Sequence, residues 1–356
     1  MSLLIAEKII GLIGTSISSP QHSSAHWNFF NSGKKLSPNN LVNFRLTGLS
    51  GGLDDAHTLD TLPALIIDVL QHISLEELIS SLPSSNVGHC PHSVKTSQGY
   101  INGNDLFFAV WLNQLRSFFS SNPADILEIG GGYGGFARTI ISALPNLTSY
   151  TIIELPLSAT LATYYLHETT DCGIYFNGLQ VRNAAGKPDI NIYTPDFDLE
   201  RRPKRFDLAI NTRSMMEMNR NVIDSYFDYI NETLQPNGIF FNINRYLKST
   251  SGDIIRICDF PYDDHWNLLS SSPSFRQNRL HCLIAKRLNN DTDGNLKAEL
   301  TAIAQLPESA ISPGYRMETL GSKLSCKVFA VRFLKQIISL IPSKLRKKIG
   351  HLFLAD

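Results

Sequence analysis

The sequence predicts an α/β fold, in which the strands of one sheet alternate along the chain with helices. An apolar run at 125–129 is followed by a glycine cluster at 130–135 and by an apolar helical segment at 136–144. This is the pattern of a strand, a tight turn and a helix. A second run, apolar and β-branched, lies at 149–155 and precedes a helical segment at 157–169. Repetition of this unit is typical of a parallel sheet with helical connections.

The remaining elements follow from the same periodicities. Before the glycine cluster we expect helices at 3–13, 62–72, 75–82 and 105–120, a polar loop at 21–40 and a glycine-rich turn at 48–55. After it we expect strands at 174–181, 190–193, 206–211 and 238–247, a helix at 222–234 and a closing strand at 280–286. An insertion at 254–266 separates the last two strands.

Composition limits the class of protein. The chain has 356 residues, of which 43% are apolar and 18% charged, as in a soluble globular protein with a large core. Lys and Arg equal Asp and Glu at 32 each, which argues against a nucleic-acid partner. The five cysteines form no CxxC pair, so we expect reduced thiols in a cytoplasmic protein, with no zinc site. We expect neither a signal peptide nor a membrane span, because Glu7 and Lys8 interrupt the first apolar stretch.

The glycine cluster fits two ligand-binding patterns. The glycines alone satisfy the dinucleotide fingerprint, whereas Glu128 with Gly130, Gly132 and Gly134 satisfies the pattern of enzymes that bind S-adenosylmethionine (SAM). Glu128 would repel a pyrophosphate and attract the cationic amino acid end of SAM. Glu154 ends the next strand, where a carboxylate can accept both ribose hydroxyls of either ligand. A turn without a ligand and a solvated Glu154 are the plainer alternatives.

Four segments together carry a family resemblance. EIGGGYGGFAR at 128–138, IIELP at 152–156, FDLAINTRSMMEM at 206–218 and HCLIAKR at 281–287 resemble class I SAM-dependent methyltransferases. More narrowly, they resemble a bacterial family of sugar O-methyltransferases, over residues 87–288. The resemblance implies a Rossmann-like sheet of seven strands, the last antiparallel. It leaves a helical N-terminal region at 1–86 and a helical, basic extension at 289–356.

The resemblance also implies the activity and the cofactor site. The activity is transfer of the SAM methyl group to a hydroxyl of a sugar or glycan precursor, in polysaccharide biosynthesis. In methyltransferases an acidic or amide residue beside an apolar one meets the adenine. Asp196 and Phe197 fit that role, although Asp198 competes and an ordinary loop is as good an explanation. The implied cofactor contacts are Glu128, Gly130, Gly132, Tyr133, Gly134, Glu154, Leu155, Asp196, Phe197 and Asn211.

Two segments compete to supply the catalytic base. Glu217 follows the fourth strand and is flanked by methionines, and an apolar setting would raise the proton affinity of its carboxylate. A helix N-terminal glutamate is the alternative. The segment PYDDHW places His265 next to Asp264, which offers a His–carboxylate pair. Its two aspartates could also hold a divalent cation, although no metal site is indicated, and a surface loop is the alternative.

Candidate acceptor contacts lie in two polar segments. The loop at 86–103 carries His89 and Asn102, whose imidazole and amide groups can hydrogen-bond a sugar. Ser214 lies in the segment after the fourth strand, on the side where methyltransferases place the acceptor. The aromatic residues at 105–120 are expected to belong to the core.

Three placements are possible for the basic helical segment at 323–354. It could lie on the anionic inner face of the membrane, pack on the enzyme, or pack on a second subunit in a homo-oligomer. Two other functions stay open. An NAD(P)-dependent oxidoreductase would need a hydride-transfer pair such as Tyr-x-x-x-Lys, which we do not find. A non-catalytic scaffold with a methyltransferase-like fold would lack a base.

Overall fold

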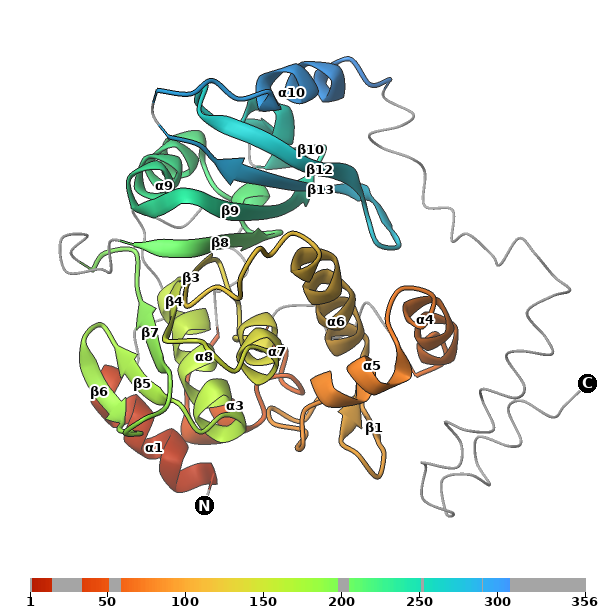
Figure 1. Ribbon diagram of the computed structural model, residues 1–356. Helices are drawn as coiled ribbons and strands as arrows, with labels where there is room; N and C mark the ends of the chain where they lie inside the picture. Colours follow the sequence, from red (N-terminus) through yellow and green to blue (C-terminus); the bar gives the residue numbers. More distant parts are fainter. Residues whose placement is uncertain are drawn as a thin grey trace, which may run out of the picture.

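The chain folds into one large sheet with helices on both faces, as the alternation of strands and helices predicted (Figure 1). The computed structural model describes residues 2–14, 34–50, 59–197, 205–250, 253–289 and 291–307. The basic segment at 323–354, Asp198 and parts of the segments at 21–40 and 48–55 lie outside these residues. Within the described residues, no helix is long and apolar enough to span a membrane.

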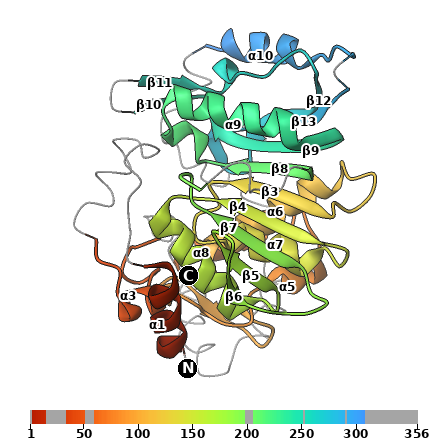
Figure 2. The ribbon, with the colours of Figure 1, turned by 90° about the vertical axis from the view of Figure 1, so that its left-hand side faces the viewer.

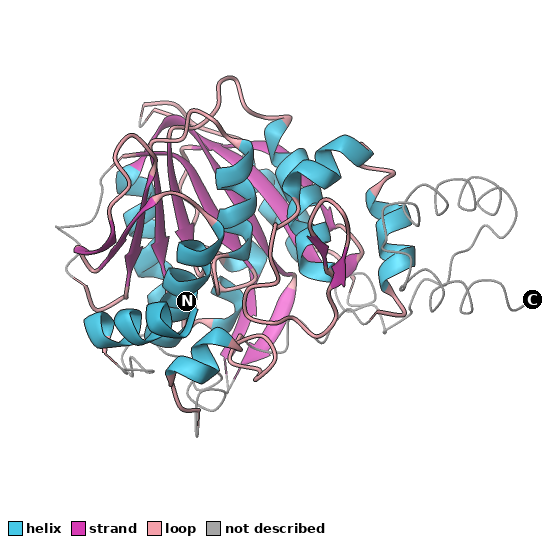
Figure 3. Cartoon of the chain, turned by 90° about the horizontal axis from the view of Figure 1, so that it is seen from below, coloured by secondary structure: helices cyan, strands magenta, loops and turns pink. Residues whose placement is uncertain are grey.

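In the described residues the sheet has nine strands, in the order β12-β13-β9-β8-β3-β4-β7-β5-β6. Figure 3 shows the strands side by side, with helices next to the sheet. Strands β7, β4, β3, β8 and β9 are parallel. They are the third, second, first, fourth and fifth of the doubly wound order. The strand bounds are β3 Asp125–Ile129, β4 Ser149–Ile153, β5 Gly173–Phe176, β6 Leu179–Arg182, β7 Asp189–Tyr193, β8 Phe206–Thr212, β9 Leu234–Arg245, β12 Trp266–Ser274 and β13 Gln277–Arg287.

The reversed last strand is confirmed, whereas the expected count of seven strands is too low. β13 pairs antiparallel with β9, and β12 pairs antiparallel with β13. The run expected as one strand at 174–181 is a hairpin of β5 and β6. Asn177 and Gly178, with φ of 47° and 77°, form its turn, which is the Asn-Gly signal of a tight hairpin. β12 is the other additional strand, and it follows the insertion at 254–266.

The helices divide between the two faces of the sheet. Helices α6, α7 and α8 pack on one face with the N-terminal helices, and α9 and α10 pack on the other. In Figure 2, α9 and α10 lie near β9, β12 and β13, and α1 and α3 lie near β5 and β6. The helix bounds are α1 Ser2–Ile13, α3 Pro38–Val42, α4 Leu62–Val69, α5 Leu75–Ser81, α6 Gly103–Arg116, α7 Gly135–Ala143, α8 Pro156–Thr169, α9 Arg220–Thr233 and α10 Leu296–Ala304.

The structure also contains shorter helices and strands outside the large sheet. Helix α3 occupies part of the segment expected as loop, because Ser37 caps it and Pro38 suits its first turn. β1 Val94–Lys95 pairs with β2 Tyr100–Ile101, and β10 Leu247–Thr250 pairs with β11 Asp253–Arg256, each pair as a separate two-stranded antiparallel sheet. Two short 3-10 helices are η3 Met215–Glu217 and η4 Ile257–Asp259.

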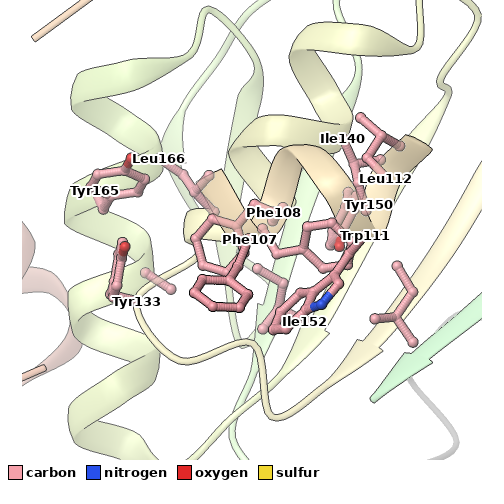
Figure 4. Close-up of a cluster of buried hydrophobic side chains, with 14 of the residues drawn as sticks. Phe107, Phe108, Trp111, Leu112, Tyr133, Ile140, Tyr150, Ile152, Tyr165 and Leu166 are labelled. Atoms are coloured by element: carbon pink, nitrogen blue, oxygen red, sulfur yellow. The ribbon is translucent and has the colours of Figure 1, made fainter. Parts of the chain in front are cut away.

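Aromatic side chains fill the space between α6, α7 and α8, as expected for the segment at 105–120. The ring of Phe108 stacks on Phe136 with centroids 5.6 Å apart, and Trp111 meets the edge of Phe136 at 5.8 Å. Figure 4 shows Phe107, Phe108 and Trp111 together, with Tyr133 and Tyr165 beside them. These helices are therefore fixed on the sheet by packing.

A buried ion pair joins α6 to α7. The Arg138 guanidinium lies 3.5 Å from the Asp105 carboxylate, and both side chains are almost completely buried. Arg138 also donates to the Ser81 carbonyl at 2.6 Å, and Asn102 donates to Asp105 at 2.5 Å. The network thus connects α5, α6 and α7.

Asp105→Ala should destabilise the fold by about 3–5 kcal/mol, because it leaves the Arg138 charge buried without its carboxylate. Urea unfolding measures this change. The control is Asp259→Ala, which breaks the exposed Arg220–Asp259 pair and should cost less than about 1 kcal/mol. Equal losses in the two variants would contradict the assignment.

Candidate functional site

The candidate site lies where the chain order of the sheet reverses, between β3 and β8. In open α/β sheets, ligands bind at this switch point, outside the carboxyl ends of the strands. The glycine turn follows β3 at this edge, and the segment at 213–217 follows β8. Gly130 donates its N–H to the Ile153 carbonyl at 2.9 Å, so the tips of β3 and β4 are joined.

The glycine turn requires glycine at specific positions. Gly130, Gly132 and Gly134 have φ of 75°, 58° and 84°, a region that side chains strain. A Cβ added at Gly130 would overlap the Ser214 hydroxyl. A Cβ at Gly132 would meet no atom within 4 Å, so the backbone there faces open space. Gly132 is therefore the point of the turn that a ligand can approach.

Glu154 closes onto the glycine turn. Its carboxylate accepts the Gly132 N–H at 2.6 Å and the Leu155 N–H at 2.7 Å. Leu155 caps the start of α8, so one side chain ties the tip of β4 to two neighbouring segments. A carboxylate has about four lone-pair sites, and two of them are left for a ligand.

Glu128 is buried beneath the turn. It is 1% exposed and accepts a hydrogen bond from the Tyr150 hydroxyl at 2.9 Å. A Cβ added at Gly131 would lie 3.0 Å from its carboxylate. Burial raises the pKa of Glu128 to about 7, opposed by the Tyr150 hydrogen bond and reinforced by the Glu154 charge. Burial also raises the pKa of Glu154 to about 7, opposed by its two backbone hydrogen bonds.

Neither carboxylate is neutralised by the protein. Among the residues that the structure describes, no lysine, arginine or histidine forms an ion pair with Glu128 or Glu154. Burying a carboxylate without a cation is costly. The two groups flank a turn with open space at Gly132, so the site favours a cationic ligand.

A chain of buried amides holds the segment after β8 against the turn. Asn211 donates to the Ile129 carbonyl at 2.8 Å, and Asn244 donates to the Asn211 carbonyl oxygen at 2.8 Å. Asn244 also donates to Asn242 at 2.5 Å, and Asn242 donates to the Tyr262 hydroxyl at 2.8 Å. Sequence reasoning missed Asn242 and Asn244. Their signal was two polar residues inside the apolar strand β9.

This network corrects two predicted roles. Asn211 was expected to contact the cofactor and Ser214 the acceptor. The Asn211 amide is fully buried, and its nitrogen and its oxygen are already hydrogen-bonded within the protein. The Ser214 hydroxyl donates to the Ile129 carbonyl at 3.0 Å and lies against Gly130. Both side chains therefore fasten the loop after β8 to the glycine turn.

Glu217 lies at the predicted edge, but its surroundings differ from the prediction. It lies in η3 after β8 and is 9% exposed. Its carboxylate forms an ion pair with Lys248 of β10, so the purely apolar setting expected from the neighbouring methionines is wrong. The contact with Lys248 holds the Glu217 side chain against the hairpin that carries β10.

His265 and Asp264, the competing candidates for the catalytic base, lie at the opposite edge of the sheet from the glycine turn. β12 runs parallel to β9, so the residues before Trp266 lie at the amino edge, where Trp266 pairs with Arg287. The sheet is about 20 Å long between the two edges. Asp264 forms an exposed pair with Lys297, and the His265 imidazole donates to the Thr292 carbonyl at 3.1 Å. The PYDDHW segment instead contacts α10 and the loop before it, through the Asp264–Lys297 pair and the hydrogen bond from the Gly294 N–H to the Asp264 carbonyl.

The predicted acceptor contacts in the polar loop are also not assembled. Asn102 is 2% exposed and caps α6, with its oxygen accepting the Asp105 N–H and its nitrogen donating to the Asp105 carboxylate. His89 is exposed and hydrogen-bonds Asn43 at 2.7 Å. The side chains of Asn102 and His89 are therefore hydrogen-bonded within the protein, Asn102 as the cap of α6 and His89 to Asn43 of the N-terminal region.

The remaining predicted cofactor contacts divide into two groups. Tyr133 is 3% exposed, and its ring packs on Phe44 and Tyr165 at 5.5 and 5.0 Å, so only its backbone is available to a ligand at the turn. Asp196 and Phe197 follow β7. Phe197 stacks on Tyr193 at 5.0 Å, and Tyr193 accepts the Glu154 N–H. These two residues therefore lie beside the tip that carries Glu154.

Arg213 is a second feature that sequence reasoning missed. It directly follows β8 with φ of 65°, and its guanidinium carbon lies 5.3 Å from the centre of the Trp111 ring. Burial lowers the pKa of Arg213 to about 10, an effect that the Tyr133 hydroxyl opposes, so the side chain stays charged at neutral pH. Only the tertiary structure brings α6 beside this position.

The described residues contain no group of three or more His, Cys, Asp and Glu side chains that could hold a metal ion. The Glu128 carboxylate lies against Gly131, and Glu154 accepts the Gly132 N–H. The site is therefore organised around a turn and two acidic groups.

Comparison with known proteins gives partial structural matches. No family model matches the chain, and no curated protein matches its sequence. A mitomycin 7-O-methyltransferase is 16% identical over 52% of this chain and 57% of its own, with a TM-score of 0.36. Human N-acetylserotonin methyltransferase in complex with SAM is 14% identical over 52% and 54%, with a TM-score of 0.35. TehB from Haemophilus influenzae is 14% identical over 53% and 68%, with a TM-score of 0.37.

The chain thus spans little more than half the length of the first two of these proteins.

Gly130→Ala should destabilise the protein by about 2–4 kcal/mol, because it adds a clash with Ser214 to the strain of a positive φ. Gly132→Ala should cost about 1–2 kcal/mol, because its Cβ enters open space. Urea unfolding compares the two. In a Ser214→Gly background the two alanine variants should cost the same, and a persistent difference would contradict the assigned contact.

Relative to a Glu128→Gln variant, the ligand-free wild-type protein should lose stability as pH rises from about 5 to about 7. The folded state raises the pKa of Glu128 to about 7, so in this window it binds more protons than the unfolded chain, and deprotonation favours unfolding. Above about pH 7 this loss is complete. Glu128→Gln, which keeps the shape of the side chain, should remove the contribution of Glu128 and leave that of Glu154, whose pKa is also raised to about 7. A variant with the wild-type pH profile would show that Glu128 does not titrate in this range.

Proposed function

We propose that the protein is a SAM-dependent methyltransferase that methylates a hydroxyl of a sugar or glycan precursor. One observation carries the cofactor: Glu128 and Glu154 flank the glycine turn, and no cation of the described chain pairs with either. SAM carries a sulfonium and an ammonium group. A cationic ligand offsets the cost of two ionised carboxylates in a partly dry site.

The same geometry argues against a dinucleotide. A pyrophosphate at such a turn would need the backbone N–H groups before the helix. Gly132 already donates its N–H to Glu154 at 2.6 Å, so an internal anion occupies this position. Glu128 beneath the turn adds a second negative charge. An NAD(P)-dependent oxidoreductase is therefore the weaker alternative.

The residues present fit SAM in distinct ways. Glu154 keeps lone pairs for ribose hydroxyls, Gly132 offers backbone with open space beside it, and Glu128 supplies a charge for the ammonium group. Asp196 and Phe197 stay candidates for the adenine because they adjoin the Glu154 tip. When bound, SAM would supply an activated methyl group. The protein would then have to position the acceptor and take up its proton.

Glu217 is the base that we propose. It lies at the switch-point edge, and its ion pair with Lys248 holds the carboxylate in one orientation. An alkyl hydroxyl is a weak acid, so a carboxylate that accepts its proton during attack lowers the barrier. Lys248 acts as a positioning residue, because it contacts Glu217 and lies on the neighbouring hairpin β10.

The sugar acceptor rests on the sequence resemblance of the segments at 128–138, 152–156, 206–218 and 281–287. The division into regions 1–86, 87–288 and 289–356 is proposed on the same basis. The proposed location of the methylation reaction, in the cytoplasm, also rests on this resemblance. Contact of the segment at 323–354 with a membrane surface or with a second copy stays part of this proposal.

Direct binding tests the cofactor. Calorimetry should detect SAM binding and no binding of NAD. The affinity for SAM should fall as pH is lowered from about 7 to about 5, by up to about tenfold per unit for each proton taken up, because protonation removes the negative charge. Release of S-adenosylhomocysteine with glycan acceptors then separates an enzyme from a binding scaffold. Binding of NAD but not SAM would overturn the proposal.

Glu217→Gln should lower kcat by about 10²–10⁴-fold with little change in SAM affinity, because it keeps the shape and removes basicity. Methyl transfer from labelled SAM measures the rate. His265→Ala is the matched control and should leave the rate near wild type, because His265 lies at the amino edge. A larger loss of kcat in His265→Ala than in Glu217→Gln would indicate that the catalytic base lies in PYDDHW.

A further inference from the structure

Arg213 and Trp111 bring two hydrogen-bond donors together without an acceptor. The structure gives the Arg213 side chain no hydrogen bond or ion pair with a described residue, only its contact with the Trp111 ring at 5.3 Å. Trp111 is completely buried, and its indole N–H also has no acceptor. Neither donor can satisfy the other, because guanidinium and indole groups only donate.

The guanidinium lies at the proposed site. Arg213 follows Thr212, the last residue of β8, at the switch-point edge. The next residue, Ser214, lies against Gly130 of the turn. Trp111 belongs to α6, and the Tyr133 hydroxyl of the turn acts electrostatically on Arg213. The charged group therefore lies between α6 and the glycine turn, on the face of the sheet that also holds Glu128.

The backbone holds this arginine in place. A residue with a side chain at φ of 65° is strained, and such strain persists where the surroundings impose it, often at functional sites. Here the Arg213 N–H donates to the Ile243 carbonyl at 2.7 Å, and the amide network anchors the following loop. The guanidinium is thus presented from a rigid position, which reduces the entropy lost on binding.

We propose that Arg213, stacked on Trp111, binds a carboxylate or phosphate group of the ligand at the switch point. Guanidinium groups recognise both anions through paired hydrogen bonds. The inference rests on the proposed function for where the ligand sits. The anion has two possible sources: the carboxylate of SAM itself, beside the ammonium group assigned to Glu128, or an acidic group on the acceptor.

Calorimetry on the full-length protein tests the inference with four probes. They are SAM, decarboxylated SAM, inorganic phosphate and glucuronate, the last two with and without S-adenosylhomocysteine. The variants are Arg213→Gln, which removes the charge, and Arg213→Lys, which keeps it without the planar group. Arg220→Gln is the matched control, because Arg220 is exposed and forms its ion pair with Asp259. Thermal unfolding checks that each variant folds.

Arg213→Gln should weaken at least one anionic probe by about tenfold to a hundredfold, the effect of losing hydrogen bonds to a charged group. Arg213→Lys should recover part of this loss, and the control should match wild type. Loss for SAM but not for decarboxylated SAM identifies the SAM carboxylate as the anion. Loss for phosphate or glucuronate with unchanged SAM identifies the acceptor.

Two results would overturn the inference: wild-type affinity of Arg213→Gln for every probe, or equal losses for SAM and decarboxylated SAM alone. Failure of the proposed function looks different. In that case wild-type protein binds neither SAM nor its decarboxylated form, while phosphate binding still depends on Arg213.

Discussion

The hydrogen bond from the Gly132 N–H to Glu154 is the interaction on which the site depends. It joins the turn after β3 to the tip of β4, and it places a carboxylate where a phosphate-binding turn would hold its ligand. With Glu128 buried below, the turn carries two acidic groups whose pKa values are raised to about 7. A turn with this charge prefers cations, although its glycine pattern also fits dinucleotides.

Rigidity at this edge comes from polar groups buried inside the sheet. The amide chain from Tyr262 through Asn242 and Asn244 to Asn211 ends on the Ile129 carbonyl, the last residue of β3. Because each member has a partner, the network specifies one arrangement of the loop after β8. That loop carries Arg213, Ser214 and Glu217, so the fold fixes the proposed base and the proposed anion-binding group relative to the turn.

The two edges of the sheet differ in role: one carries the candidate site, and the other holds structural contacts. The carboxyl edge gathers the glycine turn, Glu154 and Glu217, whereas the amino edge fastens α10 through the segment before β12. This division explains why PYDDHW has a structural role, although its composition is that of an active-site segment. Its aspartates pair with Arg287 and Lys297, and strand direction sets its position.

The sequence by itself determined the local elements and the acidic turn. The glycines, Glu128 and Glu154 could be identified because a turn with positive φ and strand ends leave signals over a few residues. Tertiary structure decided what depends on strand order and direction: the edge on which His265 lies, the pairing of Glu217 with Lys248, and the meeting of Arg213 with Trp111. It also used Asn102, Asn211 and Ser214 as internal hydrogen-bonding groups, because burial forces polar side chains to find partners that sequence spacing does not show.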